Sequence, residues 1–395
     1  MSSALVIAVV AGLICGRDAA AQDAAKAGQE RFEWQVASPE SQQMSLSRLE
    51  ALREKLVQRR TTALVVIRND RIVYQWYAAG MDGHQPLGTA SLAKAIVGGM
   101  SLAVPLSDGL VSLDDPVSRF VPAWKDDADK SKITIRHLGS HTSGLSDASQ
   151  PNVPHEKLTG WMGDFWKRLG PPNDPFSIAR DKAPVLFSAG REIRYSNPGI
   201  AMLTYCVAAA LRETPHRDIR LLLRDRVMRP IGVPDGEWTI GYGTAYQVDG
   251  LPLRAAWGGG NYSLDAVARI GRLVLRKGDW DGAQVLGSKA IEQITTDAGL
   301  VGHCGMGWWT NGGGRWPALP RDAVWGAGAG DRVLLVVPSL GLIAVRHGQA
   351  LLTADELEQL KPKDVFEEYH DPRERVFFRP LLETVLDRPL EKQAP

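Results

Sequence analysis

"TTALVVIRNDRIVYQWYAAG", residues 61–80, is the stretch that decides the fold. Two runs rich in β-branched and aromatic residues flank Asn69-Asp70, a pair that favours a tight turn, so the stretch predicts a β-hairpin. A helix that opens with "ASLAK", residues 90–94, follows it. Residues 45–59, "SLSRLEALREKLVQR", carry leucines at helical spacing and predict an amphipathic helix before the hairpin.

Strand-like runs return only towards the other end of the chain. They are "MGWWTN" (306–311), "AVWGAGAG" (323–330), "RVLLVVP" (332–338) and "LGLIAVRHG" (340–348). A clean amphipathic helix capped by Ser263 precedes them, and "RVFFRPLLETVLD", residues 375–387, predicts a C-terminal helix. The economical assembly is an α+β fold in which one antiparallel sheet, built from both ends of the chain, is flanked by helices.

The middle of the chain differs from its ends in composition and in pattern. Pro, Gly, Asp and Trp recur over residues 105–255, separated by short helical patterns such as 198–212, with no alternating strand pattern. We expect a mostly helical subdomain inserted into one domain that spans residues 45–395, after a lead-in over 22–44. A cleft between the sheet and the insertion is the natural binding site.

Composition narrows the classes of partner. The chain has 395 residues, 44% hydrophobic and 23% charged, with a net charge of +1. This balance favours a small-molecule ligand, because the chain lacks the excess of positive charge that is typical of proteins that bind nucleic acid. The sequence has no CxxC, no HExxH and no histidine cluster at ligand spacing, so we expect neither a metal nor a cofactor.

The first residues resemble an export signal. The uncharged apolar run "SALVIAVVAGLICG" precedes Ala19 and Ala21, which form an A-x-A cleavage site before Gln22, so residues 1–21 predict a signal peptide. Lipid attachment at Cys15 and a retained N-terminal anchor are the alternatives, and they would be the only membrane contact. We therefore expect a periplasmic or secreted protein.

Two cysteines lie beyond the leader. Cys206 falls in an apolar helical pattern that favours a buried, inert thiol. A disulfide to Cys304 is possible in an exported protein, but it cannot be read from spacing.

Ser91 and Lys94 lie three residues apart where small residues open the predicted helix, so they share one face of it. The positive end of the helix dipole stabilises developing negative charge on oxygen, and with desolvation it disfavours a protonated lysine. A neutral lysine beside a serine can activate it as a nucleophile. A capping serine with a snorkelling lysine is the alternative. This Ser-x-x-Lys is the only one in the chain.

A second triplet lies in the middle of the chain. "FSAGREIRYSNPGIAML", residues 187–203, contains Tyr195 and Asn197 on a predicted loop that leads into a helix. A turn with a helix cap explains the triplet equally well. Tyr-x-Asn also occurs once, and the loop could face the cleft.

Ser-x-x-Lys followed by Tyr-x-Asn resembles the penicillin-recognising serine hydrolases, in the class C β-lactamase-like branch. That branch holds class C β-lactamases, DD-peptidases, esterases and oligoamide hydrolases. Further stretches resemble it in the same order, over about residues 45 to 350: "GLVSLDDPVSRFVP", "ITIRHLGSHTSGL", "WDGAQVL" and "GMGWWTN". The resemblance implies a β-lactamase/transpeptidase-like fold.

The resemblance also implies roles for individual residues. Ser91 would be the nucleophile, Lys94 its proton acceptor and Tyr195 the second acid/base. Asn197 would bind a substrate carbonyl or orient Lys94. The oxyanion hole would combine the backbone N–H of Ser91 with that of Gly328 or Ala329, depending on the frame of the strand 323–330.

That strand departs from the family pattern. Lactam-processing relatives carry Lys-Thr-Gly there, whereas this chain offers Trp325-Gly326-Ala327 or, one residue later, Gly326-Ala327-Gly328. Neither frame has a cation to bind a substrate carboxylate, although Arg332 or Arg346 could replace it. Ester or amide hydrolysis through an acyl-enzyme on Ser91 is therefore the leading hypothesis.

DD-peptidase activity, β-lactamase activity and a non-catalytic binding protein for peptidoglycan fragments are the alternatives. His141 in "SHTSGL" suggests a Ser-His-Asp triad, but the resemblance gives it a structural place. Five tryptophans are more typical of core or cleft wall than of binding platforms: Trp161, Trp166, Trp257, Trp308 and Trp309.

Overall fold

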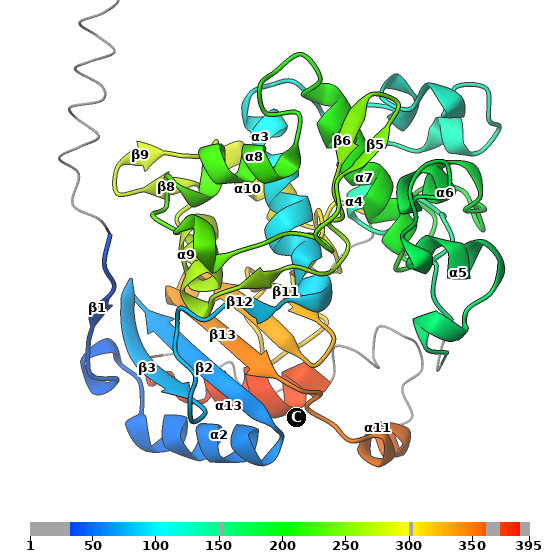
Figure 1. Cartoon of the computed structure of the whole chain (residues 1–395). Helices are drawn as coiled ribbons and strands as arrows, with labels where there is room; N and C mark the ends of the chain where they lie inside the picture. Colours follow the sequence, from blue (N-terminus) through cyan, green and yellow to red (C-terminus); the bar gives the residue numbers. More distant parts are fainter. Residues whose placement is uncertain (1–31, 151–152, 300–302, 361–371, 388–395) are drawn as a thin grey trace, which may run out of the picture. The chain divides into compact units, whose positions relative to one another are not determined.

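A seven-stranded sheet built from both ends of the chain is the centre of the fold (Figure 1). The computed structural model describes residues 32–150, 153–299, 303–360 and 372–387. The strands are, in spatial order, β1 (Gln35–Val36), β3 (Arg71–Tyr77), β2 (Thr61–Arg68), β13 (Leu342–Gly348), β12 (Arg332–Val337), β11 (Val324–Gly328) and β10 (Trp309–Thr310). The α+β class predicted from the sequence is confirmed.

The β2–β3 hairpin forms where the sequence predicts it. Asn69 and Asp70 both have positive φ, 51° and 66°, as a tight two-residue hairpin turn requires. One feature of the predicted sheet is wrong, because β1 pairs parallel to β3 while the other neighbours are antiparallel. The sheet is therefore mixed, and a two-residue strand is too short to leave a pattern in the sequence.

One face of the sheet is covered by helices from the two ends of the chain. Helix α2 (Leu46–Gln58) buries Leu49, Leu52 and Leu56 against this face, as its leucine spacing predicts. The C-terminal helix follows as a π-type turn, η11 (Glu374–Phe378), and α13 (Arg379–Leu382). It ends earlier than the predicted 375–387, and its phenylalanines and leucines join the same core.

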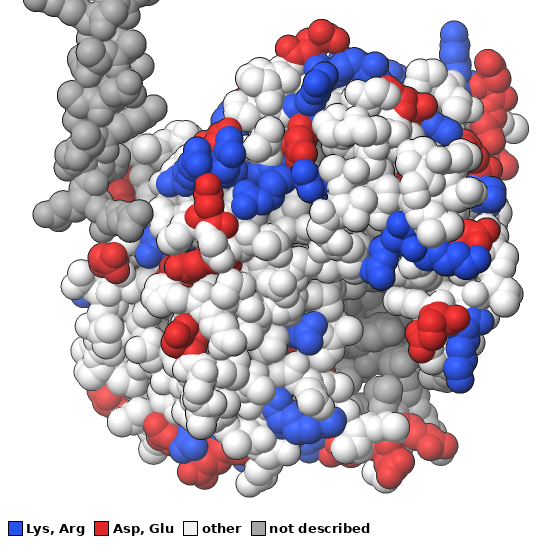
Figure 2. Space-filling view, in the orientation of Figure 1, with Lys and Arg blue, Asp and Glu red and all other residues white. Residues whose placement is uncertain are grey.

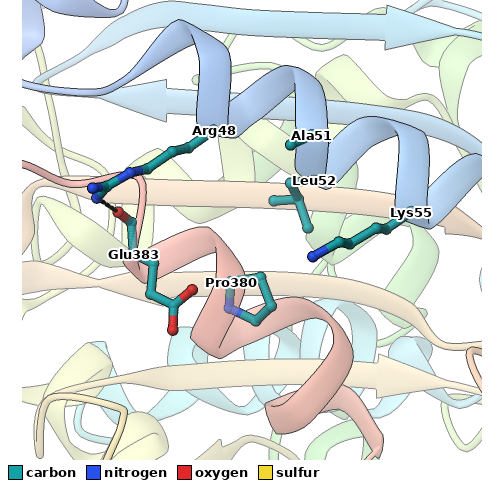
Figure 3. Close-up of a pocket in the computed structure, with 6 residues that line it drawn as sticks. All are labelled: Arg48, Ala51, Leu52, Lys55, Pro380 and Glu383. Carbon is teal, nitrogen blue, oxygen red and sulfur yellow. Dashed lines mark hydrogen bonds between the residues drawn. The ribbon is translucent and has the colours of Figure 1, made fainter.

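A cavity of about 420 Å³ opens between α2 and α13. Figure 3 shows Arg48 and Lys55 of α2 facing Pro380 of α13 and Glu383, the residue that follows α13. The Arg48 Nη1 donates a hydrogen bond to the Glu383 carbonyl oxygen at 2.6 Å. The cavity lies on the face of the sheet that α2 covers.

The opposite face carries the segment that the "ASLAK" motif opens. A 3-10 turn, η2 (Ala90–Leu92), leads into a π-type turn, η3 (Lys94–Gly99), and then α3 (Met100–Ser107). Helix α9 (Leu264–Leu275) packs beside it, with the Ser263 side chain accepting from the N–H of Ala266 as the predicted cap. A Cβ on Gly271 would lie 2.8 Å from Leu334 and 2.9 Å from Ile343, so α9 lies directly on β12 and β13.

The helical middle of the chain lies beyond this layer (Figure 1). Its helices are α4 (Ile135–Gly139), α5 (Gly160–Lys167), α6 (Pro175–Asp181), α7 (Asn197–Ala210) and α8 (Ile219–Leu223), which continues as η8 (Arg224–Met228). A small hairpin, β5 (Tyr246–Val248) with β6 (Leu251–Leu253), contradicts the expectation of no strands here. Its turn, Asp249-Gly250, has positive φ at both positions, so the Asp-Gly pair was the missed signal.

Short elements complete the described chain. They are β4 (Leu87–Gly88) paired with β7 (Asn261–Tyr262), β8 (Asp279–Trp280) paired with β9 (Ala283–Gln284), α10 (Ser288–Thr295) and α11 (Ala354–Leu360). Cys206 and Cys304 are both buried free thiols, so no disulfide joins them.

Two surface properties bear on partners. Figure 2 shows acidic and basic side chains intermixed over the visible face, in keeping with the net charge of +1. Residues Ala90–Ser107 are long and apolar enough to cross a membrane, but 78% of that stretch is buried inside the molecule, as in a core helix. The predicted leader and Cys15 lie outside the described residues.

Candidate active site

Ser91 and Lys94 face a common point at the start of the apolar helical segment. Ser91 lies in η2 and is partly exposed, whereas Lys94 begins η3 and is only 3% exposed. The π-type turn is rare and frequently marks functional sites. A Cβ on Gly307 would lie 2.3 Å from the Lys94 carbonyl oxygen, so the "GMGWW" stretch presses directly against this turn.

Tyr195 and Asn197 reach the same point from the loop that enters α7. Ser196 caps α7, because its Oγ accepts from the N–H of Gly199 at 2.9 Å, and Asn197 is the first helical residue. Tyr195 Oη donates to Ser91 Oγ at 2.8 Å. The structure therefore brings together all four side chains that the two sequence motifs single out.

Lys94 Nζ has three polar neighbours. It lies 2.8 Å from Asn197 Oδ1 and 3.3 Å from Ser91 Oγ, and it donates to the carbonyl oxygen of Trp257. It also lies 4.5 Å from the centre of the Tyr195 ring. The contact with the Trp257 carbonyl was missed from the sequence, because a backbone oxygen carries no sequence signal.

Burial controls the charge of Lys94. Desolvation lowers the pKa of Lys94 from its usual value near 10.5 to about 7, against the opposing charge of Asp147. A large part of the Lys94 population is therefore neutral at physiological pH. A lysine held near neutrality in this way is suited to accept a proton.

His141 and Asp147 hold the loop that carries Tyr195 in place through hydrogen bonds. The N–H of Ser196 donates to His141 Nδ1 at 3.2 Å, and the N–H of Arg194 donates to the His141 carbonyl oxygen at 2.8 Å. Asp147 Oδ1 accepts from both the backbone and the side-chain N–H groups of Asn197. Asp147 has no signal in the sequence, because no spacing rule connects it to Asn197, fifty positions later.

His141 is a structural residue. It is 2% exposed, and desolvation together with the charge of Lys94 lowers its pKa to about 3. Its ring packs against Tyr195 at 4.8 Å between centres. Because Nδ1 accepts a backbone N–H, that nitrogen has no free lone pair for a proton from Ser91.

Strand β11 passes directly beside Ser91. A Cβ on Gly328 would lie 2.3 Å from the Thr89 carbonyl oxygen and 3.0 Å from the Ser91 nitrogen, so only glycine fits at this position. The N–H of Asn311 donates to the Ala323 carbonyl oxygen. The backbone groups of odd-numbered residues in β11 therefore point towards β10, and those of even-numbered residues point towards β12. By that alternation the Gly328 amide faces β12, and Ala329 is the first residue beyond the paired strand.

The two arginines suggested by the sequence lie on neighbouring strands in different surroundings. Arg346 is buried and bonds to Thr61 Oγ1 and to the carbonyl oxygens of Gly330, Asp331 and Gln349, so it anchors the β11–β12 turn. Arg332 Nη1 would lie 3.6 Å from a Cβ on Gly88, against the segment that leads into η2. Trp325, Gly326 and Ala327 are all buried.

The five tryptophans divide between buried and partly exposed positions. Trp257 and Trp308 are fully buried, and the side chains of Trp161, Trp166 and Trp309 are partly exposed.

A separate polar cluster joins His84, Glu237 and Asp265, whose ligand atoms lie within 4.8 Å of one another. His84 Nδ1 contacts Glu237 Oε1 at 3.0 Å, and Arg269 Nε donates to Asp265 Oδ2 at 2.6 Å. These contacts describe an ion-pair network. The sequence could not show it, because the three residues come from distant segments.

The chain is similar to known proteins both in sequence and in structure. The family profile described as "Beta-lactamase" matches residues 49–362. A beta-lactamase of Pseudomonas fluorescens is 25% identical over 233 residues, which are 54% of this chain and 57% of that protein. The chain therefore spans little more than half the length of that relative.

Solved structures show the same fold. EstCE1, a hydrolase with promiscuous acyltransferase activity, superposes with a TM-score of 0.60 and 16% identity, covering 86% of this chain and 98% of that one. A D-stereospecific amidohydrolase from Streptomyces superposes with a TM-score of 0.56 and 16% identity, covering 77% of this chain and 93% of that one.

Proposed function

This chain belongs to the beta-lactamase family of hydrolases, and from that premise we propose that it cleaves an ester or amide bond through an acyl-enzyme on Ser91. Ser91 would attack, Lys94 would take its proton, and Tyr195 would serve the leaving group. No metal or cofactor is needed for these steps.

The contacts of Lys94 Nζ carry the proposal. A neutral lysine has two N–H donors and one lone pair. The carbonyl oxygens of Asn197 and Trp257 take the two donors, so the lone pair is directed at the third neighbour, Ser91 Oγ. Ser91 can therefore donate its proton to Lys94 at the moment of attack.

The chemical step follows from these contacts. The Ser91 oxygen forms a bond to the substrate carbonyl carbon while its proton passes to Lys94, and the carbonyl electron pair moves to oxygen. Collapse of this tetrahedral intermediate breaks the bond to the leaving group, which takes the proton of Lys94 through Tyr195. Water then attacks the acyl-enzyme while Tyr195 relays a proton of the water to Lys94. The second tetrahedral intermediate breaks its bond to Ser91, and the Ser91 oxygen takes its proton back from Lys94. General acid–base help of this kind contributes about 10²–10⁴-fold.

The oxyanion would be held by two backbone N–H groups. Ser91 supplies the first, in the opening turn of the helical segment, where the dipole favours negative charge. Ala329 is a better second donor than Gly328, because the strand alternation directs the Gly328 amide towards β12. The loss of one such donor costs about 2.7–4 kcal/mol of transition-state stabilisation.

The substrate would lack a carboxylate beside the scissile bond. The third-motif positions Trp325, Gly326 and Ala327 carry no charge, and Arg346 is committed to the β11–β12 turn. This favours neutral esters and amides over β-lactams and over peptides that end in D-alanine. The esterase and amidohydrolase titles of the similar structures fit this preference.

Turnover of p-nitrophenyl butyrate tests the proposal. We expect wild type to release p-nitrophenol and Ser91→Ala to lose at least about 10³-fold of the rate, because the nucleophile is absent. Ser288→Ala, at an exposed position at the start of α10, is the matched control and should retain full activity. Equal rates in wild type and Ser91→Ala would exclude Ser91 as the nucleophile.

A binding protein for peptidoglycan fragments remains the second candidate, favoured only by the missing cation. Fragment binding that survives in Ser91→Ala, with no turnover of any ester or amide by wild type, would support it.

We also propose export through residues 1–21. Fractionation of cells that express the chain with and without those residues tests this.

A further inference from the structure

Asp147 lies behind Asn197, on the side away from Lys94. Its Oδ1 accepts from the backbone N–H of Asn197 at 2.7 Å and from the side-chain Nδ2 at 2.9 Å. The opposite end of the Asn197 amide, Oδ1, lies 2.8 Å from Lys94 Nζ. The amide therefore bridges a carboxylate and the candidate base.

The direction of this amide decides what happens to the Lys94 lone pair. In the observed direction, Asn197 accepts a proton from Lys94 and leaves its lone pair for Ser91. In the flipped direction, the NH₂ group would face Lys94, and a neutral amine would accept that N–H through the lone pair it needs. The lone pair of Lys94 would then already accept a hydrogen bond from Asn197 and could not take the Ser91 proton.

Asp147 makes the flipped direction unfavourable. A flip would place Asn197 Oδ1 against the carboxylate oxygen, so two acceptors would meet at 2.9 Å with no proton between them. A buried acceptor that loses its partner is unfavourable, and more so when the group is charged. The backbone N–H of Asn197 also holds the carboxylate, so it cannot rotate away without losing a second bond.

We propose that Asp147 is a positioning residue that fixes the Asn197 amide and so keeps the Lys94 lone pair directed at Ser91. This inference rests on the proposed function, because it assigns Asp147 a part in activating the same nucleophile. Asp147 touches neither Ser91 nor the reacting atoms, and it acts through Asn197.

The charge of Asp147 has a second, separable effect. The groups that face Lys94 are Ser91, Tyr195, His141, Asn197 and the Trp257 carbonyl. Among the described residues, Asp147 is the carboxylate whose charge raises the pKa of Lys94 against desolvation. Removal of that charge should lower the pKa of Lys94 further.

Two substitutions separate position from charge. Asp147→Asn retains an oxygen that can accept from Asn197 but has no charge. Asp147→Ala removes both. Asp126→Asn, at an exposed aspartate in the same helical part of the chain, is the matched control. Each variant is compared with wild type in the pH profile of kcat/KM for p-nitrophenyl butyrate, and thermal melting reports folding.

We expect Asp147→Ala to lose about 10²-fold in kcat/KM, within the range for general-base catalysis. Asp147→Asn should keep its plateau rate within about tenfold, while its acid limb moves to lower pH by about one unit. The direction follows because less proton affinity on Lys94 means that lower pH is needed to protonate it. A merely structural role would lower melting temperature without moving the acid limb.

Two results would overturn the proposal. One is an Asp147→Asn variant whose plateau in kcat/KM is as low as that of Asp147→Ala, although its side chain can still accept from Asn197. The other is a well-folded Asp147→Ala that keeps more than a third of wild-type kcat/KM. If Asp147→Ala does not fold, the plateau of Asp147→Asn decides alone, and a loss beyond the tenfold expected above overturns the proposal. Failure of the proposed function is recognised separately, because wild type and Ser91→Ala would then react equally.

Discussion

Two buried cations lie in this molecule in opposite surroundings. Arg272 of α9 is 2% exposed and bonds to two carboxylates, those of Asp70 and Asp281. Lys94 is 3% exposed, and its close partners are a serine, an amide and a backbone carbonyl, with its nearest carboxylate behind Asn197. Desolvation lowers the pKa of both side chains, but the carboxylates outweigh it at Arg272, whose pKa is raised.

The charge of the partners distinguishes a cation that joins two structural elements from one that is suited to give up its proton. Arg272 ties the β2–β3 turn to α9, because Asp70 lies in that turn, so its charge is kept and neutralised. Lys94 is surrounded by neutral acceptors that tolerate loss of its proton. The two side chains are almost equally inaccessible to solvent, but the charge of their partners differs.

The largest expected effect comes from Lys94→Met, which keeps the length of the side chain and removes the amine. We expect kcat/KM to fall about 10³-fold, because Ser91 loses its proton acceptor. The free energy of unfolding should fall by about 1–3 kcal/mol, because the carbonyl oxygens of Asn197 and Trp257 lose their donor inside the molecule. Ester kinetics with urea unfolding measure both quantities, and a variant that keeps a tenth of the activity would break the comparison.

Gly328→Ala should have the next largest effect. A methyl group there would lie 2.3 Å from the Thr89 carbonyl oxygen, so the turn that carries Ser91 must shift. We expect about 10²-fold lower kcat from misplacement of the oxyanion donors. Gly170→Ala is the control, because nothing lies within 4 Å of a Cβ at that position. Equal activity in both variants would remove β11 from the candidate site.

Arg272→Met sharpens the comparison from the structural side. Its loss removes the ion pair of Asp281 with Arg272, leaves Asp70 with Arg276, and removes the guanidinium that lies over Trp280 at 4.3 Å. Both aspartates are about a third exposed or more, so solvent screens them, and we expect about 2 kcal/mol of lost stability. Specific activity of the folded fraction should remain that of wild type, and a loss matching Lys94→Met would contradict the division of roles.

The smallest effect on activity is expected for His141→Asn. The new side-chain oxygen lies near the position of Nδ1 and can still accept from the N–H of Ser196. We expect less than a tenfold loss and an unchanged acid limb in the pH profile. A Ser-His-Asp triad would instead require a loss of about 10⁴-fold, so steady-state kinetics on this variant distinguish the two mechanisms.

Much of the fold could be predicted because its elements carry local patterns. The leucines of α2, the Asn-Asp turn after β2 and the Ser263 cap of α9 are signals within single segments. Short elements such as β1 and the β5–β6 hairpin gave too few residues for a period.

The site could be predicted only as far as its motifs reach. Ser91, Lys94, Tyr195 and Asn197 stand in two compact motifs, so their meeting was foreseen. Asp147 and the Trp257 carbonyl enter through tertiary contacts with no spacing rule. The same holds for the preference for Ala329 over Gly328, which depends on strand register.

The most direct test of the account is the pH dependence of acylation by wild type, followed as single-turnover release of p-nitrophenol from p-nitrophenyl butyrate. Lys94 must be neutral to accept the Ser91 proton, so the rate should fall as pH drops below its pKa of about 7 and level off above it. An acid limb near pH 7 that disappears in Lys94→Met is the predicted result. A rate that stays constant down to pH 5 would contradict the claim that neutral Lys94 activates Ser91.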